Sequence, residues 1–230
     1  MQYKITIILL LGLFSFSSIS LSSNSNKKSH LSSDKTILSY NTNAEIIYQN
    51  LKANNFVLPS LKTFAEAVDG FNKFKQKGVV QKDILTVVDF SLSSNVKRLW
   101  VIDMKNYSIL FHSLVAHGRN SGEEFAKQFS NKPESFQSSL GFYSTAETYF
   151  GKHGYSLRLD GLESGINNKA RDRAVVIHGA DYVSESFIQK NGRLGRSFGC
   201  PSIPNEISKE IIDVIKDKSC LFVYHKSKNG

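Results

Sequence analysis

Cysteine is scarce in this sequence, since its 230 residues include only Cys200 and Cys220. The pair allows a single disulfide bridge within the chain, and otherwise leaves both thiols free. Long apolar runs are lacking too: residues 5–16 form an apolar run of 12 residues, and no later segment is apolar enough to span a bilayer. A spanning helix needs about 20 apolar residues. We therefore expect no stable membrane span in the processed chain.

The short apolar run at the N-terminus fits another kind of segment. Lys4 gives it a positive start, and small residues follow it at Ser18 and Ser20. This order is typical of a secretory signal peptide, which we predict over residues 1–20 with cleavage near Ser20. No cysteine follows the run, so a lipid has no attachment point there.

Acidic residues are fewer than basic ones, 20 against 29, which gives a formal net charge of +9. The basic residues are spread along the chain, and together with export this argues against nucleic acid as a partner. For an exported basic protein an anionic cell wall is the natural partner, although the charge also serves solubility.

Two regions follow the signal segment and precede the main domain. Residues 21–40 are polar and Ser-rich, as in a flexible linker. Residues 41–80 show helical spacing of apolar residues, so we predict an N-terminal cap of two helices. The second helix is expected to start at Ser60 and to break at Gly70, because glycine within a helix costs about 1 kcal/mol relative to alanine.

The remaining region, residues 81–230, contains short runs rich in β-branched and aromatic residues, separated by turn residues. Such runs are typical of strands. A segment with helical spacing starts at Asn205, and "CLFVYHK" at 220–226 closes the chain as a strand. The sequence therefore predicts a mostly β (α+β) domain of sandwich or barrel type, with helices at its N-terminus and after Cys200.

Three histidines precede a glycine and compete as partners for a thiol, namely His117, His153 and His178. His153 lies in a hairpin-like turn, where solvent exposure is expected. His117 and His178 each end a strand, at a rim where sites are commonly built. The polar loop 180–196 can bring Cys200 back beside the strand end of His178. We therefore select His178 and keep His117 as its competitor.

Cys200 lies in "GRSFGCPSIP" and has the surroundings of a nucleophile. A free thiol has a pKa of about 8.5, so a base must take its proton before it attacks. His178 would be that base, and the carbonyl of Gly179 would hold the imidazole in one tautomer. The N–H groups of Gly199 and Cys200 would stabilise an oxyanion. Ser197 would bond either the turn or the nucleophile.

These residues resemble a known signature. "HG" at 178–179, a gap of 17 residues, and "SFGC" at 197–200 look like the pattern of L,D-transpeptidase (YkuD-like) catalytic domains. "SLGFYS" at 139–144 is similar to the strand that precedes the histidine in that family. The resemblance covers roughly residues 84–226 and is strongest to a divergent murein L,D-transpeptidase branch.

The resemblance implies an exported cysteine acyltransferase of peptidoglycan stem peptides, located in the periplasm or cell envelope of a bacterium. Cys200 would attack the carbonyl of the third stem residue and release the terminal D-alanine. His178 would act first as base and then as acid, and the thioester would pass to an amine or to water. No metal or cofactor is implied.

Two positions depart from the pattern of the family. Many members carry His where Phe198 stands, and Arg or Asn where Ser202 stands. An arginine elsewhere would then meet the substrate carboxylate, because a guanidinium binds a carboxylate through two hydrogen bonds. The residues assigned to substrate binding are Arg196, Tyr143 and Ser202, with Arg193 and Arg119 as further cations.

Two other functions stay open at this point. An L,D-carboxypeptidase or another peptidoglycan hydrolase would use the same cysteine and histidine, but would let water reach the thioester. A non-enzymatic wall-binding module would instead have Cys200 and Cys220 joined in a disulfide.

Overall fold

The computed structural model describes residues 43–229. The predicted signal peptide and the Ser-rich linker lie outside the described residues. Within 43–229, no helix is both long and apolar enough to cross a membrane.

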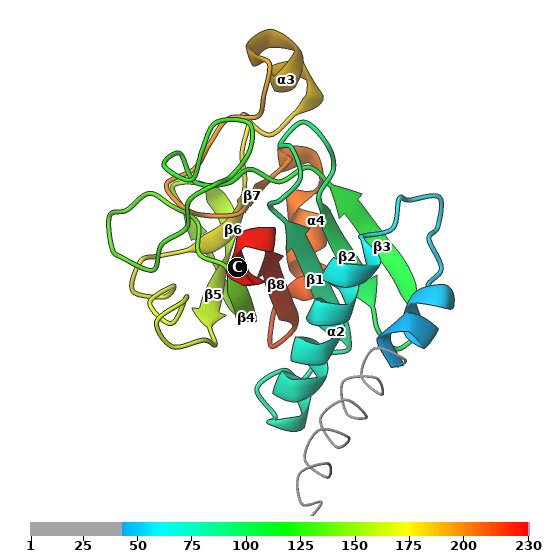
Figure 1. The fold of residues 1–230 in the computed structure, drawn as a ribbon. Coiled ribbons are helices and arrows are strands. Elements are labelled where there is room, and N and C mark those ends of the chain that lie inside the picture. The colour runs from blue at the N-terminus through cyan, green and yellow to red at the C-terminus, as the bar shows by residue number, and fades with distance from the viewer. Residues whose placement is uncertain (1–42, 230) are drawn as a thin grey trace, which may run out of the picture. The chain divides into compact units, whose positions relative to one another are not determined.

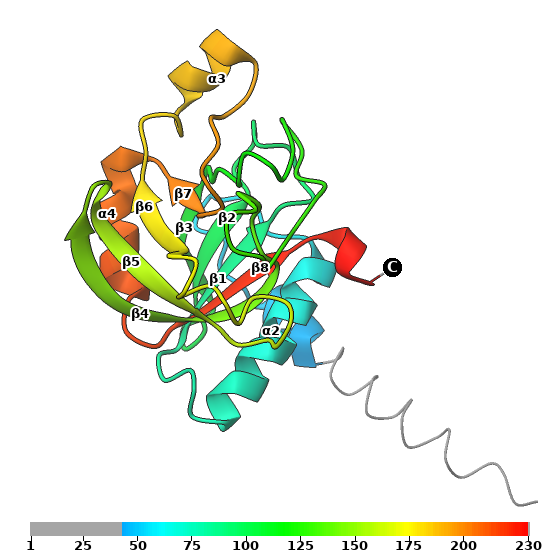
Figure 2. The ribbon, with the colours of Figure 1, turned by 90° about the vertical axis from the view of Figure 1, so that its left-hand side faces the viewer.

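The main feature is one mixed sheet of eight strands in the order β3-β2-β1-β8-β4-β5-β6-β7 (Figure 1). Two pairs of neighbours, β1 with β8 and β6 with β7, are parallel, and the other pairs are antiparallel. The sheet curls into a nearly closed barrel, which confirms the predicted mostly β class (Figure 2). The strands are β1 (Ile84–Asp89), β2 (Leu99–Asp103), β3 (Ser108–Ser113), β4 (Gly141–Gly151), β5 (Gly154–Gly161), β6 (Val176–Gly179), β7 (Ser202–Ile203) and β8 (Cys220–Tyr224).

Helices precede the first strand, lie between the later strands and follow the last strand. Residues 43–49 form a first helix. The described part of the chain then contains α2 (Leu61–Gln76), α3 (Glu185–Asn191), α4 (Asn205–Ile215) and the short 3₁₀ helix η1 (Lys226–Asn229). Helix α2 packs on β1 and β8, whereas α4 packs on β6, β1 and β5. The helices predicted at the N-terminus and after Cys200 are therefore present.

Helix α2 begins as predicted and does not break where expected. The side chain of Ser60 accepts a hydrogen bond from the N–H of Thr63, so Ser60 is its N-cap. The helix runs unbroken through Gly70. A Cβ at that position would lie 2.0 Å from the ring of Phe142, so the glycine lets a β4 aromatic ring pack against the helix. The expected break is thus wrong, because packing outweighs helix propensity here.

The apolar core fills both faces of the sheet. One cluster lies between the N-terminal helices and the sheet, and includes Phe64, Phe142 and Phe222. A second cluster includes strand residues such as Leu157 and the buried stripe of α4. Polar residues 180–196 are only partly a loop, because α3 forms within them.

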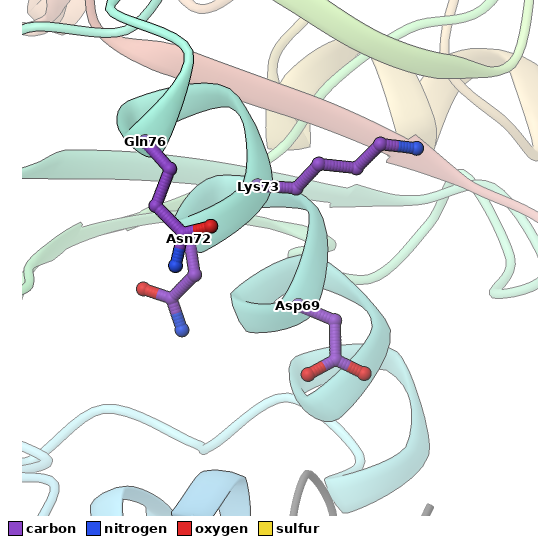
Figure 3. A pocket seen from close by; sticks show the side chains of 4 residues that line it. All are labelled: Asp69, Asn72, Lys73 and Gln76. Carbon is purple, nitrogen blue, oxygen red and sulfur yellow. The ribbon is translucent and has the colours of Figure 1, made fainter. Parts of the chain in front are cut away.

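A pocket of about 290 Å³ lies on α2, away from the strands that carry the cysteine and histidine motifs (Figure 3). Asp69, Asn72, Lys73 and Gln76 line it. These residues are spaced so that they share one face of the helix. None belongs to the predicted site.

Candidate active site

The two cysteines differ in their surroundings, and both are free. Cys220 is buried in β8, between Leu85 of β1 and Ser144 of β4. Burial raises the pKa of its thiol to about 12, so this side chain behaves as a small apolar group. Cys200 is half-buried, at the end of a turn. The alternative of a Cys200–Cys220 disulfide is therefore contradicted.

The turn before Cys200 is held by its own residues. The hydroxyl of Ser197 accepts from the N–H of Gly199 at 3.0 Å and donates to the carbonyl of Cys200 at 2.6 Å. Gly199 has a φ of +124°, and a Cβ there would lie 2.9 Å from the carbonyl oxygen of Gln137. Only glycine fits this backbone without strain. Ser197 thus bonds the turn and not the thiol.

This turn changes which groups are available to stabilise an oxyanion. The N–H of Gly199 is already bonded to Ser197, so it is not free in the way we predicted. Loss of water raises the pKa of the Cys200 thiol, and the backbone N–H groups of Val176 and of Cys200 itself act against this rise. Val176 starts β6 and was not among the predicted residues, because the contact depends on how two distant segments meet.

His178 lies in β6 opposite Ser202 of β7, the parallel neighbour (Figure 1). Its Nδ1 is 2.8 Å from the carbonyl oxygen of Gly179, and its Nε2 is 3.0 Å from the hydroxyl of Ser202. A carbonyl oxygen only accepts, so Nδ1 carries the proton and Nε2 is the accepting nitrogen. The geometry therefore presents Nε2 as the basic atom.

Ser202 is part of the histidine's surroundings. It is fully buried, and its hydroxyl lies 2.9 Å from the phenol oxygen of Tyr182 as well as 3.0 Å from His178 Nε2. The structure thus places Ser202 against the basic nitrogen of His178, and its role in binding substrate stays a prediction. Burial raises the pKa of Tyr182, and a charged Cys200 raises it further. Tyr182, which comes from the 180–196 segment, thus lies close to both groups.

The thiol and the imidazole do not bond each other directly within the described chain. The Sγ of Cys200 donates a weak hydrogen bond of 3.8 Å to the carbonyl oxygen of Ala174. The charges of Arg173 and Lys152 act against the rise in the pKa of the thiol that burial causes. Each of the two groups is therefore held by other partners in this state.

The pKa values of the pair shift in opposite directions. Loss of water around the thiol raises the pKa of Cys200. Burial lowers the pKa of His178, and repulsion from His153 lowers it further. The hydrogen bond to Gly179 raises it, but by less than burial lowers it. Both shifts favour the uncharged forms, a thiol on Cys200 and a neutral imidazole on His178.

His153 contacts the other histidine, which the sequence did not suggest. It is exposed at the turn between β4 and β5, as expected. Its ring stacks on that of His178, with centroids 4.4 Å apart and planes at 20°. The pairing of Ser156 with His178 brings the end of this hairpin beside β6, and no local sequence pattern reports such a register.

His117, the competing histidine, is locked inside the protein. It is fully buried. Its Nδ1 lies 2.9 Å from a guanidinium nitrogen of Arg98, and its Nε2 lies 3.3 Å from the carbonyl oxygen of Gly122. Burial, followed by the charge of Arg98, lowers its pKa to about 4. Both ring nitrogens are therefore engaged by structural partners.

The predicted substrate arginines pair within the protein. Arg196 forms an ion pair of 2.6 Å with Glu123, and Arg193 forms one of 2.9 Å with the same carboxylate. Neither is thus left free for a substrate carboxylate. The guanidinium of Arg119 instead lies over the rings of Phe136 and Phe198, at 5.9 and 5.8 Å.

Tyr143, which the sequence assigned to substrate binding, is buried in the structure. It is 2% exposed, and its hydroxyl donates to the carbonyl of Ser139 at 2.9 Å. With Gly199 and Pro201 it lines a void of about 10 Å³, which holds one water at most. Tyr143 therefore lies under the turn that carries Cys200.

No group of three or more His, Cys, Asp or Glu in residues 43–229 is arranged to hold a metal ion. His178, Ser202 and Tyr182 form one hydrogen-bonded chain, and Cys200, two residues before Ser202, is influenced by backbone N–H groups and by the charges of Arg173 and Lys152. This set can perform acid–base and nucleophilic chemistry.

The chain is similar to several solved structures and to the profile of one protein family. Among curated proteins no match is found. An L,D-transpeptidase from Mycobacterium smegmatis is 13% identical with a TM-score of 0.38, over 62% of this chain and 59% of that one. L,D-transpeptidase 1 of Mycobacterium tuberculosis is 13% identical with a TM-score of 0.35, over 62% of each chain. The helical cell shape determining protein of Campylobacter jejuni is 12% identical with a TM-score of 0.43, over 68% and 53%.

The chain thus spans between 53% and 62% of the length of these three solved structures. The profile of the L,D-transpeptidase catalytic domain family (YkuD_2) matches residues 58–224, from the residues before α2 to the end of β8. That is well over half of the sequence. The chain belongs to the L,D-transpeptidase catalytic domain family.

Proposed function

We propose that this protein is a cysteine-dependent L,D-transpeptidase that acts on peptidoglycan stem peptides, with Cys200 as nucleophile and His178 as base. The observation that carries the proposal is the hydrogen bonding of His178, whose Nδ1–H is held by the Gly179 carbonyl so that Nε2 accepts a proton. Family membership supports the same reaction.

The pairing of β6 with β7 supports this choice, because it sets His178 opposite Ser202. Ser202 contacts Nε2. Cys200 precedes Ser202 by two residues, at the end of the turn that leads into β7. Rotation of the thiol away from Ala174 O, with rotation of the Ser202 hydroxyl, would let Sγ donate to Nε2.

Acylation would then follow in balanced steps. Nε2 of His178 takes the thiol proton as Sγ forms a bond with the carbonyl carbon of the third stem residue. The oxyanion accepts from the N–H groups of Cys200 and Val176, which already face the thiol. The C–N bond to D-alanine breaks, and the imidazolium returns the proton to the leaving amine.

Deacylation would run through the same groups. An amine of a neighbouring stem attacks the thioester carbon, Nε2 takes a proton from that amine, and the departing sulfur receives it as the new amide forms. Water in place of the amine would yield a free tripeptide carboxylate. The hydrolase and the transpeptidase thus differ only in the acceptor.

The proposed location is the periplasm or cell envelope of a bacterium. Three features of the sequence support it: the signal-like residues 1–20, the substrate class of the family, and the formal charge of +9. A basic protein is attracted to an anionic wall, which raises its local concentration at the substrate.

Product analysis tests the proposal. The chain without residues 1–20 is incubated with defined tetrapeptide muropeptides and the products are read by mass spectrometry. Cross-linked dimers support the transpeptidase, and tripeptide without dimers would replace it with the hydrolase. An unaltered tetrapeptide with the folded protein would overturn both. Cys200→Ala should abolish product formation, and Cys220→Ala is the matched control that should retain it.

A further inference from the structure

The turn of the β4–β5 hairpin carries two neighbouring side chains, one of which contacts His178 while the other influences Cys200. His153 stacks on His178, with ring centroids 4.4 Å apart. Lys152, its neighbour, lowers the pKa of the Cys200 thiol by its charge. Neither residue belongs to the cysteine or histidine motif.

The backbone fixes this placement from two sides. Strand β5 pairs with β6 in a register that sets Ser156 opposite His178. The hairpin closes with Gly151 opposite Gly154, and Gly154 has a φ of +72°, a conformation that favours glycine. The turn that carries His153 is thus tight and tied to the strand of the base.

The ring of His153 restricts rotation of the His178 imidazole, in addition to the two hydrogen bonds at the edge of that imidazole. The bonds of His178 to Gly179 and Ser202 lie along the ring edge, and rotation about the side chain would break both. Flat contact with His153 opposes that rotation. His178 is only 2% exposed although His153 itself is exposed, so the outer ring lies between the inner ring and solvent.

We propose that His153 is a positioning residue for the base: its ring holds the imidazole of His178 flat, with Nε2 directed toward Ser202 and Cys200, and keeps water from its face. The inference rests on the proposed function of His178, and it names a residue that acts through another and does not touch the reacting atoms.

Charge is a separate effect of the same residue. Among titratable groups, His153 on the hairpin stacks on His178, and Tyr182 is reached through Ser202. Lys152, the neighbour of His153, acts on Cys200. A cation on His153 lowers the pKa of His178 by repulsion. His153→Phe keeps a flat ring and removes the charge, whereas His153→Ala removes both.

The hairpin offers a matched control in Phe150. Its side chain is 83% exposed, and its ring contacts Tyr155 at 5.2 Å and not the site. Phe150→Ala therefore removes an aromatic ring from the same hairpin without touching His178. Any general loosening of the hairpin would show in this variant as well.

The first test compares steady-state kinetics of these variants on tetrapeptide muropeptides. His153→Ala should lower kcat by about three- to tenfold, the range expected for loss of one aromatic contact, with little change in KM. His153→Phe should return kcat to within about twofold of the parent, and Phe150→Ala should match the parent. Equal kcat in His153→Ala and the parent, or equal loss in the Phe and Ala variants, would overturn the inference.

The second test needs no turnover and so separates this inference from the proposed function. In NMR spectra, the Nδ1–H of His178 should exchange with water faster in His153→Ala than in the parent, and His153→Phe should restore slow exchange. Unchanged exchange in His153→Ala would overturn the inference. If the parent turns over no muropeptide, the proposed function fails, and this exchange rate still decides whether His153 holds the ring.

Discussion

His117 and His178 are alike in sequence and opposite in chemistry. Each ends an extended run and precedes a glycine, and each is buried. His117 meets a guanidinium on one nitrogen and a carbonyl on the other. His178 meets a carbonyl on Nδ1 and a hydroxyl on Nε2.

The difference lies in whether the partner of the accepting nitrogen is able to move. Arg98, which donates to Nδ1 of His117, is fully buried and also donates to the carbonyls of Leu92 and Val115. The hydroxyl of Ser202 needs only to rotate to release Nε2 of His178. A buried histidine is thus available as a base when a rotatable group, and not a fixed cation, occupies its basic nitrogen.

The largest expected difference is between the activities of the His178→Gln and His117→Gln variants. His178→Gln should lower kcat/KM on muropeptides by about 10²- to 10⁴-fold, the usual contribution of a general base. His117→Gln should retain most of the activity, because His117 is buried and hydrogen-bonded to Arg98. Comparable losses in the two folded variants, measured side by side, would show that the assignment of the base is wrong.

The stability of the protein should depend on pH through His117. Its pKa is about 4 in the folded protein and about 6.5 when unfolded. Between these values the unfolded chain binds the extra proton, so stability falls as pH falls from 6.5 to 4, by up to about 3 kcal/mol from this residue. Urea unfolding across this range should show a flatter decline in His117→Gln. An equally steep decline in that variant would contradict the buried, neutral state of His117.

Arg196 and Arg119 differ in their partners, and this difference predicts different effects on substrate binding. Arg196 bonds Glu123 and the same Gly122 carbonyl that His117 contacts. Arg119 lies over the ring of Phe198, two residues before Cys200. Arg119→Ala should raise KM by about tenfold if it meets a substrate carboxylate, since a hydrogen bond to a charged group contributes about 1.5–3 kcal/mol. Arg196→Ala should change KM by less than about twofold, and the reverse ranking would restore the sequence-based assignment.

The smallest expected effect is on the pH at which kcat/KM falls on the acidic side of its pH profile, the acid limb. Burial and His153 lower the pKa of His178, so the base stays neutral at a lower pH than an ordinary imidazole. The limb of kcat/KM should therefore lie below pH 6.5, with a rate at pH 6 up to about fourfold higher than an unperturbed histidine would allow. A limb above that pH would mean that a neighbouring anion, absent from this account, stabilises the imidazolium.

The sequence was sufficient for features that are local or nearly so. The helix after Cys200, the hairpin turn at His153 and the Ser60 cap follow from spacing and turn chemistry. The choice of Cys200 and His178 came from a motif that joins one strand end to one turn. The nearby Gly179 carbonyl, one residue from His178, was also within reach of sequence reasoning.

What the sequence did not show involves contacts between segments far apart in the chain. Tyr143 was assigned to substrate binding, but β4 runs through the middle of the sheet and the side chain is buried. Arg196 was assigned to the same role, and it pairs with Glu123, which lies 73 residues earlier. Val176 and His153 were missed for the same reason, because their place beside the site depends on strand register, which the spacing of apolar residues does not report.

Trapping the acyl-enzyme tests the central claim most directly. The folded protein is mixed briefly with a tetrapeptide muropeptide, quenched in acid, digested and mapped by mass spectrometry. We predict that the peptide containing Cys200 gains the mass of the stem acyl group without its terminal D-alanine, while the peptide containing Cys220 stays unmodified. Turnover without an adduct on Cys200, persisting in Cys200→Ala, would contradict the account.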